Sequence, residues 1–157
     1  MSVDLHALYQ EVVLDHNRHP RNFRAMQGGR KAEGFNRICG DRVTVHLRVE
    51  ADVIRDACFQ GSGCAIVKAS ASLMTEHIRD LTLADAAALV ERLRRTLSAP
   101  PGAPIDDLGA LGALTGVRLF PIRIKCAVLP WEALLAALSA RDEVVYTSPR
   151  SLDRRIP

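Results

Sequence analysis

The sequence predicts a single domain that combines an antiparallel β-hairpin with several helices. Strict alternation of apolar and polar residues over 43–50 predicts a half-buried strand, and a second strand over 53–60 follows the turn Ala51-Asp52. Apolar or small residues at helical spacing lie on both sides of this hairpin. A chain of 157 residues with 48% apolar and 25% charged residues is long enough to bury a core.

The segment before the hairpin divides into a helix and a loop. Residues 4–16 carry apolar side chains at helical spacing and predict an amphipathic helix with one apolar stripe. Pro20 ends this helix, because proline disfavours helical geometry at the residue before it, here His19. Residues 24–38 are polar and contain glycines, so we expect a loop there.

Two helices are predicted directly after the hairpin. Small residues over 65–79 allow close packing and predict the first of them. Thr82, followed by Asp85 three residues later, is typical of a helix start and predicts a second helix over 83–97. Residues 98–104 are rich in proline, so we expect a loop that ends this part of the chain.

The C-terminal part of the chain predicts one more long helix. Residues 106–115 are weakly helical, and Phe120-Pro121 interrupts the segment that follows. We expect the last helix to open at Cys126, with Pro130 tolerated in its first turn.

We expect one domain over residues 1–145 and a polar, flexible tail over 146–157. The net charge is only +3, and no basic face is interleaved with aromatic residues, so we expect no nucleic-acid partner. No apolar run approaches membrane-spanning length, and charged side chains interrupt the apolar residues near the N-terminus. The sequence therefore predicts a cytoplasmic protein without a membrane partner, whose cysteines stay reduced.

Three of the four cysteines lie at special places in this arrangement. Cys64 follows two glycines and precedes a helix, whose positive N-terminal end favours the thiolate over the thiol. Cys126 has the same setting at the start of the predicted last helix. Cys39 and Asp41 lie at the entrance of the hairpin and Cys64 just beyond its exit, so strand pairing can bring these side chains together.

Three thiolates and a carboxylate form a four-coordinate set that suits zinc, and soft thiolates also suit iron–sulfur clusters. The gaps between the cysteines are long and irregular, unlike the paired motifs of a zinc ribbon. The residues alone therefore leave two interpretations open, a shared metal site or three unrelated buried cysteines.

Other chemically active side chains are expected to have more ordinary roles. Cys58 lies inside a predicted strand and is expected to be incidental there, with a spare redox thiol as the alternative. His46 and His77 are expected to be solvated. Arg123 lies just before Cys126, where it is either a solvated surface residue or a cation that stabilises thiolate or persulfide charge.

Several motifs resemble those of the IscU/NifU N-terminal family of iron–sulfur cluster assembly proteins, and the resemblance covers most of residues 4–140. The motifs are Leu14-Asp15-His16 with Pro20-Arg21-Asn22, Cys39-Gly40-Asp41, Gly61-Ser62-Gly63-Cys64 with the helix after it, and Arg123-Ile124-Lys125-Cys126-Ala127 with Leu129-Pro130-Trp131. Within the family the chain resembles the SufU branch. Lys125 stands where the IscU scaffolds carry a histidine, and the segment between Cys64 and Cys126 is longer than theirs.

The resemblance implies an α+β fold with a small antiparallel three-stranded sheet packed against helices, as in SufE- and NifU-like proteins. It implies a zinc ion held by Cys39, Asp41, Cys64 and Cys126. It also implies a zinc-dependent sulfurtransferase, in which Cys39 accepts persulfide sulfur from a PLP-dependent cysteine desulfurase of the SufS type. That sulfur would pass to downstream Suf scaffold components. Arg123 matches an arginine implicated in this branch, which makes it the second candidate catalytic residue.

Two alternatives and one departure accompany the resemblance. The same ligands would serve an IscU-type scaffold that assembles a [2Fe–2S] cluster, although Lys125 and the longer segment argue against it. The other alternative is a structural zinc domain that binds a protein partner. The departure is Arg37, which stands where the family usually has a proline and predicts a more mobile loop before Cys39.

Overall fold

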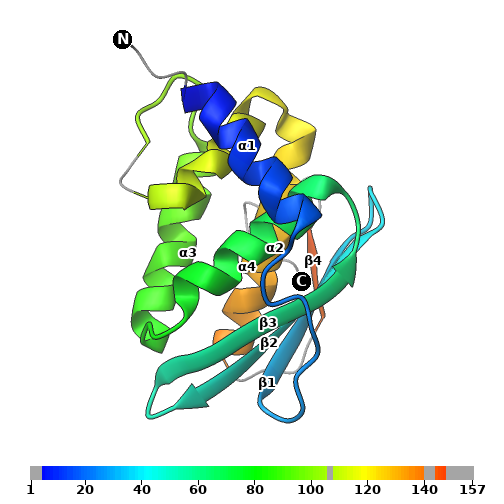
Figure 1. The fold of residues 1–157 in the computed structure, drawn as a ribbon, viewed down its shortest axis with the longest axis vertical. Helices are drawn as coiled ribbons and strands as arrows, with labels where there is room; N and C mark the ends of the chain where they lie inside the picture. The colour runs from blue at the N-terminus through cyan, green and yellow to red at the C-terminus, as the bar shows by residue number, and fades with distance from the viewer. Residues whose placement is uncertain (1–4, 106–107, 140–143, 148–157) are drawn as a thin grey trace.

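The computed structural model describes residues 5–105, 108–139 and 144–147, and in it helices gather on one side of a sheet (Figure 1). In chain order the elements are α1 (Leu5–Arg18), β1 (Arg30–Asn36), β2 (Asp41–Glu50), β3 (Val53–Ser62), α2 (Ala65–Ile78), α3 (Leu83–Ser98), η1 (Gly109–Leu119), α4 (Pro121–Leu138) and β4 (Val144–Thr147). The predicted α+β class is confirmed.

The strands lie side by side in the order β3-β2-β1-β4. β1, β2 and β3 pair antiparallel, which confirms the expected three-stranded antiparallel sheet. The short β4 adds a parallel partner to β1, a feature that the sequence pattern did not predict. The expected boundary between residues 145 and 146 falls inside β4, and residues 148–157 of the expected tail lie outside the described residues.

The expectation of a loop over residues 24–38 is wrong, because β1 forms within it. The inward positions of β1 carry Ala32, Gly34 and Asn36 instead of large apolar residues, so the alternation that marks a half-buried strand is weak. Small residues are needed at this place: a Cβ on Gly34 would lie 3.0 Å from Leu129 Cδ1 of α4. The close approach of α4 therefore explains why the sequence pattern does not predict this strand.

The predicted hairpin and the helices around it are confirmed. β2 and β3 form the hairpin, and Ala51 and Asp52 at its turn have left-handed backbone, with φ of 51° and 62°. α1, α2 and α3 lie at the predicted positions, with ends shifted by no more than about two residues. At the start of α3, Thr82 Oγ1 accepts a hydrogen bond from the backbone N–H of Asp85 at 3.0 Å, the expected cap.

The core lies between the inward face of the sheet and the helices. Val43 and Leu47 of β2 are fully buried, because every second residue of the strand points to the helices. On α4, the fully buried Trp131 donates from Nε1 to Ser70 Oγ of α2 at 3.0 Å. Ser70 donates in turn to the backbone carbonyl of Ala127 at 2.6 Å. These two hydrogen bonds hold α2 against α4 behind the sheet.

The expected start of the last helix at Cys126 is wrong. α4 begins at Pro121, where proline is tolerated because the first backbone donors of a helix have no partner anyway. Cys126 therefore lies in the second turn, and Pro130 lies in the helix interior, where its missing N–H cannot bond the carbonyl of Cys126. Before α4, the weak helical pattern over 106–115 corresponds in part to η1, a 3₁₀ helix at Gly109–Leu119.

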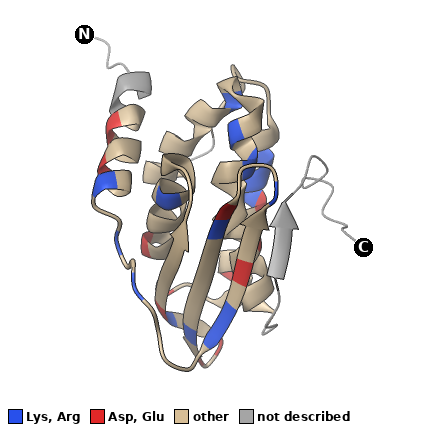
Figure 2. Ribbon diagram, turned by 90° about the vertical axis from the view of Figure 1, so that its right-hand side faces the viewer, with Lys and Arg blue, Asp and Glu red and all other residues tan. Residues whose placement is uncertain are grey.

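Basic and acidic residues are interspersed along the strands and helices seen in Figure 2. On the outward face of the sheet, the Arg42 guanidinium lies 3.9 Å from Glu33 Oε1 and 5.0 Å from the ring centre of Phe35. Among the described residues, no helix is long and apolar enough to span a membrane.

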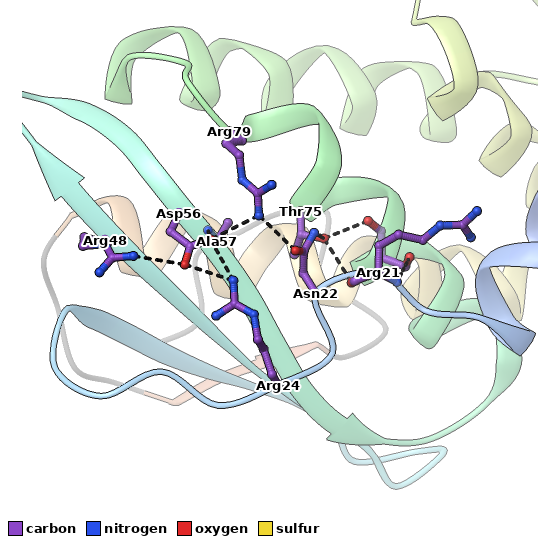
Figure 3. A network of polar contacts seen from close by, with 9 residues as sticks. Arg21, Asn22, Arg24, Arg48, Asp56, Ala57, Thr75 and Arg79 are labelled. Atoms are coloured by element: carbon purple, nitrogen blue, oxygen red, sulfur yellow. Dashed lines mark hydrogen bonds and ion pairs between the residues drawn. The ribbon is translucent and has the colours of Figure 1, made fainter.

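Asp56 of β3 is the centre of a polar network that joins β2, β3 and α2 to the segment after α1 (Figure 3). Its Oδ1 accepts hydrogen bonds from Arg24 at 2.9 Å and Arg79 at 3.1 Å, and its Oδ2 accepts one from Arg48 at 3.3 Å. Burial acts to raise the pKa of Asp56. The hydrogen bond and charge of Arg24, together with Arg79, nevertheless hold that pKa below its ordinary value of 3.8.

We expect Asp56→Asn to lower the free energy of unfolding by about 1–3 kcal/mol at neutral pH, because three arginines lose their shared counter-ion. A carboxylate with a lowered folded-state pKa contributes stability above its unfolded pKa, and that contribution is lost as pH falls through the folded pKa. The difference between wild type and variant should therefore shrink in acid, as measured by urea unfolding over a pH series.

Asp80→Asn is the matched control, because Asp80 is exposed and only 3.6 Å from the exposed Arg55. Its effect should stay within about 0.5 kcal/mol at every pH. Equal unfolding midpoints for wild type and Asp56→Asn at neutral pH would contradict a stabilising role for the network.

Candidate metal centre

Three separate segments bring the four predicted ligand side chains to one end of the sheet. The turn between β1 and β2 leads from Cys39 to Asp41, the β3–α2 junction carries Cys64, and the second turn of α4 carries Cys126. One ligand atom each from Cys39, Asp41 and Cys126 lies within 4.8 Å of the other two. The sulfur of Cys64 borders this group, 3.9 Å from Asp41 Oδ2. The two ends of the hairpin therefore meet, and α4 adds the third sulfur.

The carboxylate of Asp41 lies at the middle of the centre. It is the first residue of β2, faces the helices and is only 2% exposed. Its Oδ1 accepts a hydrogen bond from the backbone N–H of Cys64 at 3.0 Å, and its Oδ2 lies 3.3 Å from Cys126 Sγ. A buried carboxylate is costly unless donors or a cation compensate its charge. This group of thiols and a carboxylate is therefore chemically suited to a cation.

Gly63 makes room for that carboxylate. Its backbone has a φ of 155°, and a Cβ at this position would lie 2.5 Å from Asp41 Oδ1. A side chain here would push the carboxylate away from the N–H of Cys64, so only glycine permits the contact. Gly63 thus allows the carboxylate to approach the start of α2 closely.

The turn that carries Cys39 is short and closed by two hydrogen bonds. The backbone N–H of Gly40, which has a left-handed φ of 75°, donates to the Asn36 carbonyl at 2.7 Å. The backbone N–H of Ile38 donates to Asn36 Oδ1 at 3.0 Å. Cys39 itself is exposed, whereas Cys126 is fully buried. The centre therefore has one accessible sulfur and one that solvent cannot reach.

The thiols of Cys64 and Cys126 share a hydrogen bond, which separates their pKa values. A hydrogen bond with Cys126 lowers the pKa of Cys64 to about 6 against the opposing effect of burial, and the backbone N–H groups of Val67 and Ile66 contribute. The same hydrogen bond and burial raise the pKa of Cys126. Cys64 is thus the thiolate of the pair, in agreement with its place at the N-terminus of α2.

Arg123 is exposed in the first turn of α4, next to the sulfurs. Interaction with the Cys126 side chain and the charge of Cys64 raise the pKa of its guanidinium. The structure therefore places this cation beside the thiols, although the side chain is also open to solvent. A catalytic role for Arg123 stays a prediction.

The remaining candidates lie away from the centre. Cys58 is fully buried on β3, and burial raises the pKa of its thiol. It pairs with His46 of β2, on the sheet face opposite Asp41. The expectation that His46 is solvated is wrong, because it is buried and its Nε2 lies 3.2 Å from Gln60 Oε1. His77 is half-buried, with Nδ1 2.7 Å from the carbonyl of Leu73.

Asn36 is the site residue that sequence reasoning missed. It is buried at the end of β1, and its side chain and carbonyl close the turn before Gly40. A signal was available, since asparagine two residues before a bonded backbone N–H is typical of an Asx turn. That signal is weak on its own, because it gives no indication of burial.

The fold and this centre define a small α+β domain with a cysteine- and aspartate-based candidate metal site. Comparison with known families gives a more specific assignment: the NifU-like N terminal domain matches residues 8–143. The chain belongs to this family, which confirms the resemblance stated from the motifs.

Individual relatives are similar to this chain over most of their length. The zinc-dependent sulfurtransferase SufU of Bacillus subtilis is 36% identical over 85% of this chain and 90% of its own. The iron–sulfur cluster assembly scaffold protein IscU of Streptococcus pyogenes is 34% identical over 85% of this chain and 84% of its own. A crystal structure of SufU from Fervidobacterium islandicum, a proposed scaffold for the SUF system, has a TM-score of 0.76. It is 32% identical and covers 85% of this chain and 98% of its own.

We expect the metal-free protein to contain one thiolate that titrates near its pKa of about 6, visible as ultraviolet thiolate absorbance. Cys64→Ala should remove this step. Cys126→Ala should move it to higher pH, because Cys64 loses its hydrogen-bond donor.

Cys58→Ala is the matched control and should leave the step unchanged, since burial raises the pKa of Cys58. Persistence of the step in Cys64→Ala would show that another thiol carries the low pKa.

Proposed function

We propose that this protein is a zinc-dependent sulfur acceptor that takes persulfide sulfur from a SufS-type cysteine desulfurase for iron–sulfur cluster assembly. The observation that carries the proposal is an exposed thiol, Cys39, that shares its centre with the buried side chains of Asp41 and Cys126. The name of the Bacillus subtilis relative, a zinc-dependent sulfurtransferase, supports it.

Cys39, Asp41, Cys64 and Cys126 are the residues that would hold the zinc. Thiolates and carboxylates are ordinary zinc ligands. The Asp41 carboxylate lies 3.3 Å from one sulfur and 3.9 Å from another, so ionisation of these thiols would crowd negative charge in a buried place unless a cation were bound. The donor set therefore fits zinc. When bound, zinc would keep the thiols deprotonated and would supply ligand exchange without redox chemistry.

Cys39 would accept the sulfur, because its side chain is exposed on a short turn. Its thiolate attacks the terminal sulfur of the desulfurase persulfide, as in thiol–disulfide exchange. One S–S bond forms on Cys39 while the donor's S–S bond breaks, and the donor cysteine leaves as a thiolate. The electrons balance, so no further oxidant or reductant is needed. The buried Asp41 and Cys126 and the half-buried Cys64 would remain in the centre throughout.

Arg123 would stabilise the negative charge that moves through this reaction. Its guanidinium is exposed and interacts with the sulfurs of Cys126 and Cys64, and the charge of Cys39 also acts on it. A guanidinium keeps its charge at all relevant pH values and offers several N–H donors to an anionic persulfide. These properties favour a catalytic role over that of a solvated surface residue.

The partner surface would surround the exposed thiol. Large apolar side chains that are exposed lie next to Cys39 or Arg123 in the chain: Ile38, Leu119, Phe120 and Ile122. Exposed apolar residues concentrated near a reactive group are typical of a protein interface. We propose the desulfurase as the occupant, cytoplasm as the location, and downstream Suf scaffold components as the eventual recipients of the sulfur.

A scaffold for a [2Fe–2S] cluster is the second candidate function. The same thiols and carboxylate would serve it, and the Streptococcus pyogenes relative is named as a scaffold. Lys125 in place of a histidine and the long segment between Cys64 and Cys126 favour the sulfur acceptor.

We expect the zinc-loaded protein to raise the turnover of a SufS-type desulfurase, and Cys39→Ala to return that turnover to the level of the desulfurase alone. Cys58→Ala should keep the full stimulation, because Cys58 lies on the other face of the sheet. Turnover is followed as alanine formation, and bound metal is measured on the same samples.

The outcomes separate the candidates. Stimulation that Cys39→Ala abolishes supports the sulfur acceptor. Bound iron with a visible chromophore and no stimulation would support the scaffold instead, and bound zinc without stimulation would leave a structural zinc domain.

A further inference from the structure

Among the described residues, only one of the two polar atoms in the side-chain amide of Asn36 has a hydrogen-bond partner. Oδ1 accepts the hydrogen bond from the backbone N–H of Ile38 at 3.0 Å. Nδ2 is buried and has no hydrogen-bond partner among the described residues, and the whole residue is only 1% exposed. Buried amide donors almost always have a partner, so an unpaired one calls for an acceptor that forms in another state of the site.

The course of α4 along β1 indicates where this amide lies. Arg30 at the start of β1 donates to the carbonyl of Leu138, and Gly34 lies against Leu129. The strand and the helix therefore run in opposite directions. Two further strand residues advance by about 6.6 Å, which equals about four helical residues. Asn36 is thus level with Cys126 on the inward face of the sheet.

Strand pairing gives the same location independently. Asn36 is the register partner of Asp41 across β1 and β2, and both residues are buried on the inward face. Side chains at directly opposed positions of antiparallel strands lie about 5 Å apart at Cβ. Asn36 Nδ2 therefore belongs to the wall of the candidate metal centre.

The sulfur of Cys39 is the acceptor left for this donor. Both oxygens of Asp41 already have contacts, with the Cys64 N–H and with Cys126 Sγ. The sulfurs of Cys126 and Cys64 also have contacts of their own, with Asp41 Oδ2 at 3.3 Å and 3.9 Å. No hydrogen bond among the described residues ends on Cys39 Sγ, and Cys39 sits inside the turn that Asn36 closes.

We infer that Asn36 is a positioning residue for Cys39. Its Oδ1 holds the turn, and its Nδ2 donates an N–H···S hydrogen bond to the Cys39 sulfur when that sulfur is a metal-bound thiolate. Such a bond withdraws charge from the sulfur and steadies it on the metal, so it would set how readily Cys39 is released. This inference rests on the proposed zinc site and deepens it.

Asn36→Asp and Asn36→Ser both remove Nδ2 and keep an oxygen for the Ile38 N–H, while only the first adds a charge. We expect both variants to bind zinc about 10–100-fold more weakly than the wild type, measured by competition with a chromophoric chelator. The sulfur-to-metal absorption band of the cobalt-substituted protein should shift in both. In a Cys39→Ala background neither variant should weaken zinc binding further.

Asn22→Asp is the matched control, because it removes a comparable donor, the Nδ2 that bonds Thr75 Oγ1 at 3.1 Å, away from the centre. It should leave zinc affinity and the cobalt band unchanged. Unchanged affinity in both Asn36 variants would overturn the inference. So would a loss of affinity that persists in full in the Cys39→Ala background, since Asn36 would then act through another residue.

Failure of the proposed function appears differently. A wild type that binds zinc but does not stimulate the desulfurase contradicts the sulfur-acceptor role, yet the double-variant comparison still decides the role of Asn36. A wild type that does not bind zinc or cobalt overturns both.

Discussion

The buried carboxylate of Asp41 is the constraint on which the rest of the structure depends. Its two oxygens contact the backbone N–H of Cys64 and the sulfur of Cys126, so one side chain joins the hairpin, the start of α2 and α4. A carboxylate withdrawn from water needs compensation. The N-terminus of α2 supplies part of it through an N–H donor and the helix dipole. The approach also requires Gly63, because any Cβ there would meet Oδ1.

The second requirement is that α4 comes close enough to the sheet for Cys126 to reach this carboxylate. The inward face of β1 meets that requirement with small residues, and Gly34 lies directly against Leu129. The hydrogen bonds from Trp131 to Ser70 and from Ser70 to Ala127 hold α4 on its other side, against α2. The position of one sulfur is therefore the result of packing along the whole length of the helix.

These requirements also explain how far the sequence could predict the site. The hairpin and the place of Cys64 were predictable, because alternation and a glycine-containing junction before a helix are local patterns. β1 was missed because its inward residues are small or polar, so it lacks the apolar alternation of a half-buried strand. The reason for these small residues is the close approach of α4, a tertiary contact that no local sequence pattern shows. Cys126 lies one turn deeper in α4 than expected, since Pro121 starts a helix rather than interrupting it. Asn36 was missed because its importance depends on burial and on its register with Asp41.

The outward face of the sheet carries a stabilising polar network, whereas the inward face carries the candidate metal centre. The Asp56 network lies on the outward face and joins β3 to β2, to α2 and to the segment after α1 through hydrogen bonds between charged side chains. This network therefore stabilises the fold independently of the candidate metal centre. Cys39 is exposed on a short turn, whereas Asp41 and Cys126 are buried on the side of the sheet that faces the core. Under the proposed function, Cys39 would leave the centre while Asp41 and Cys126 stay in place in the core.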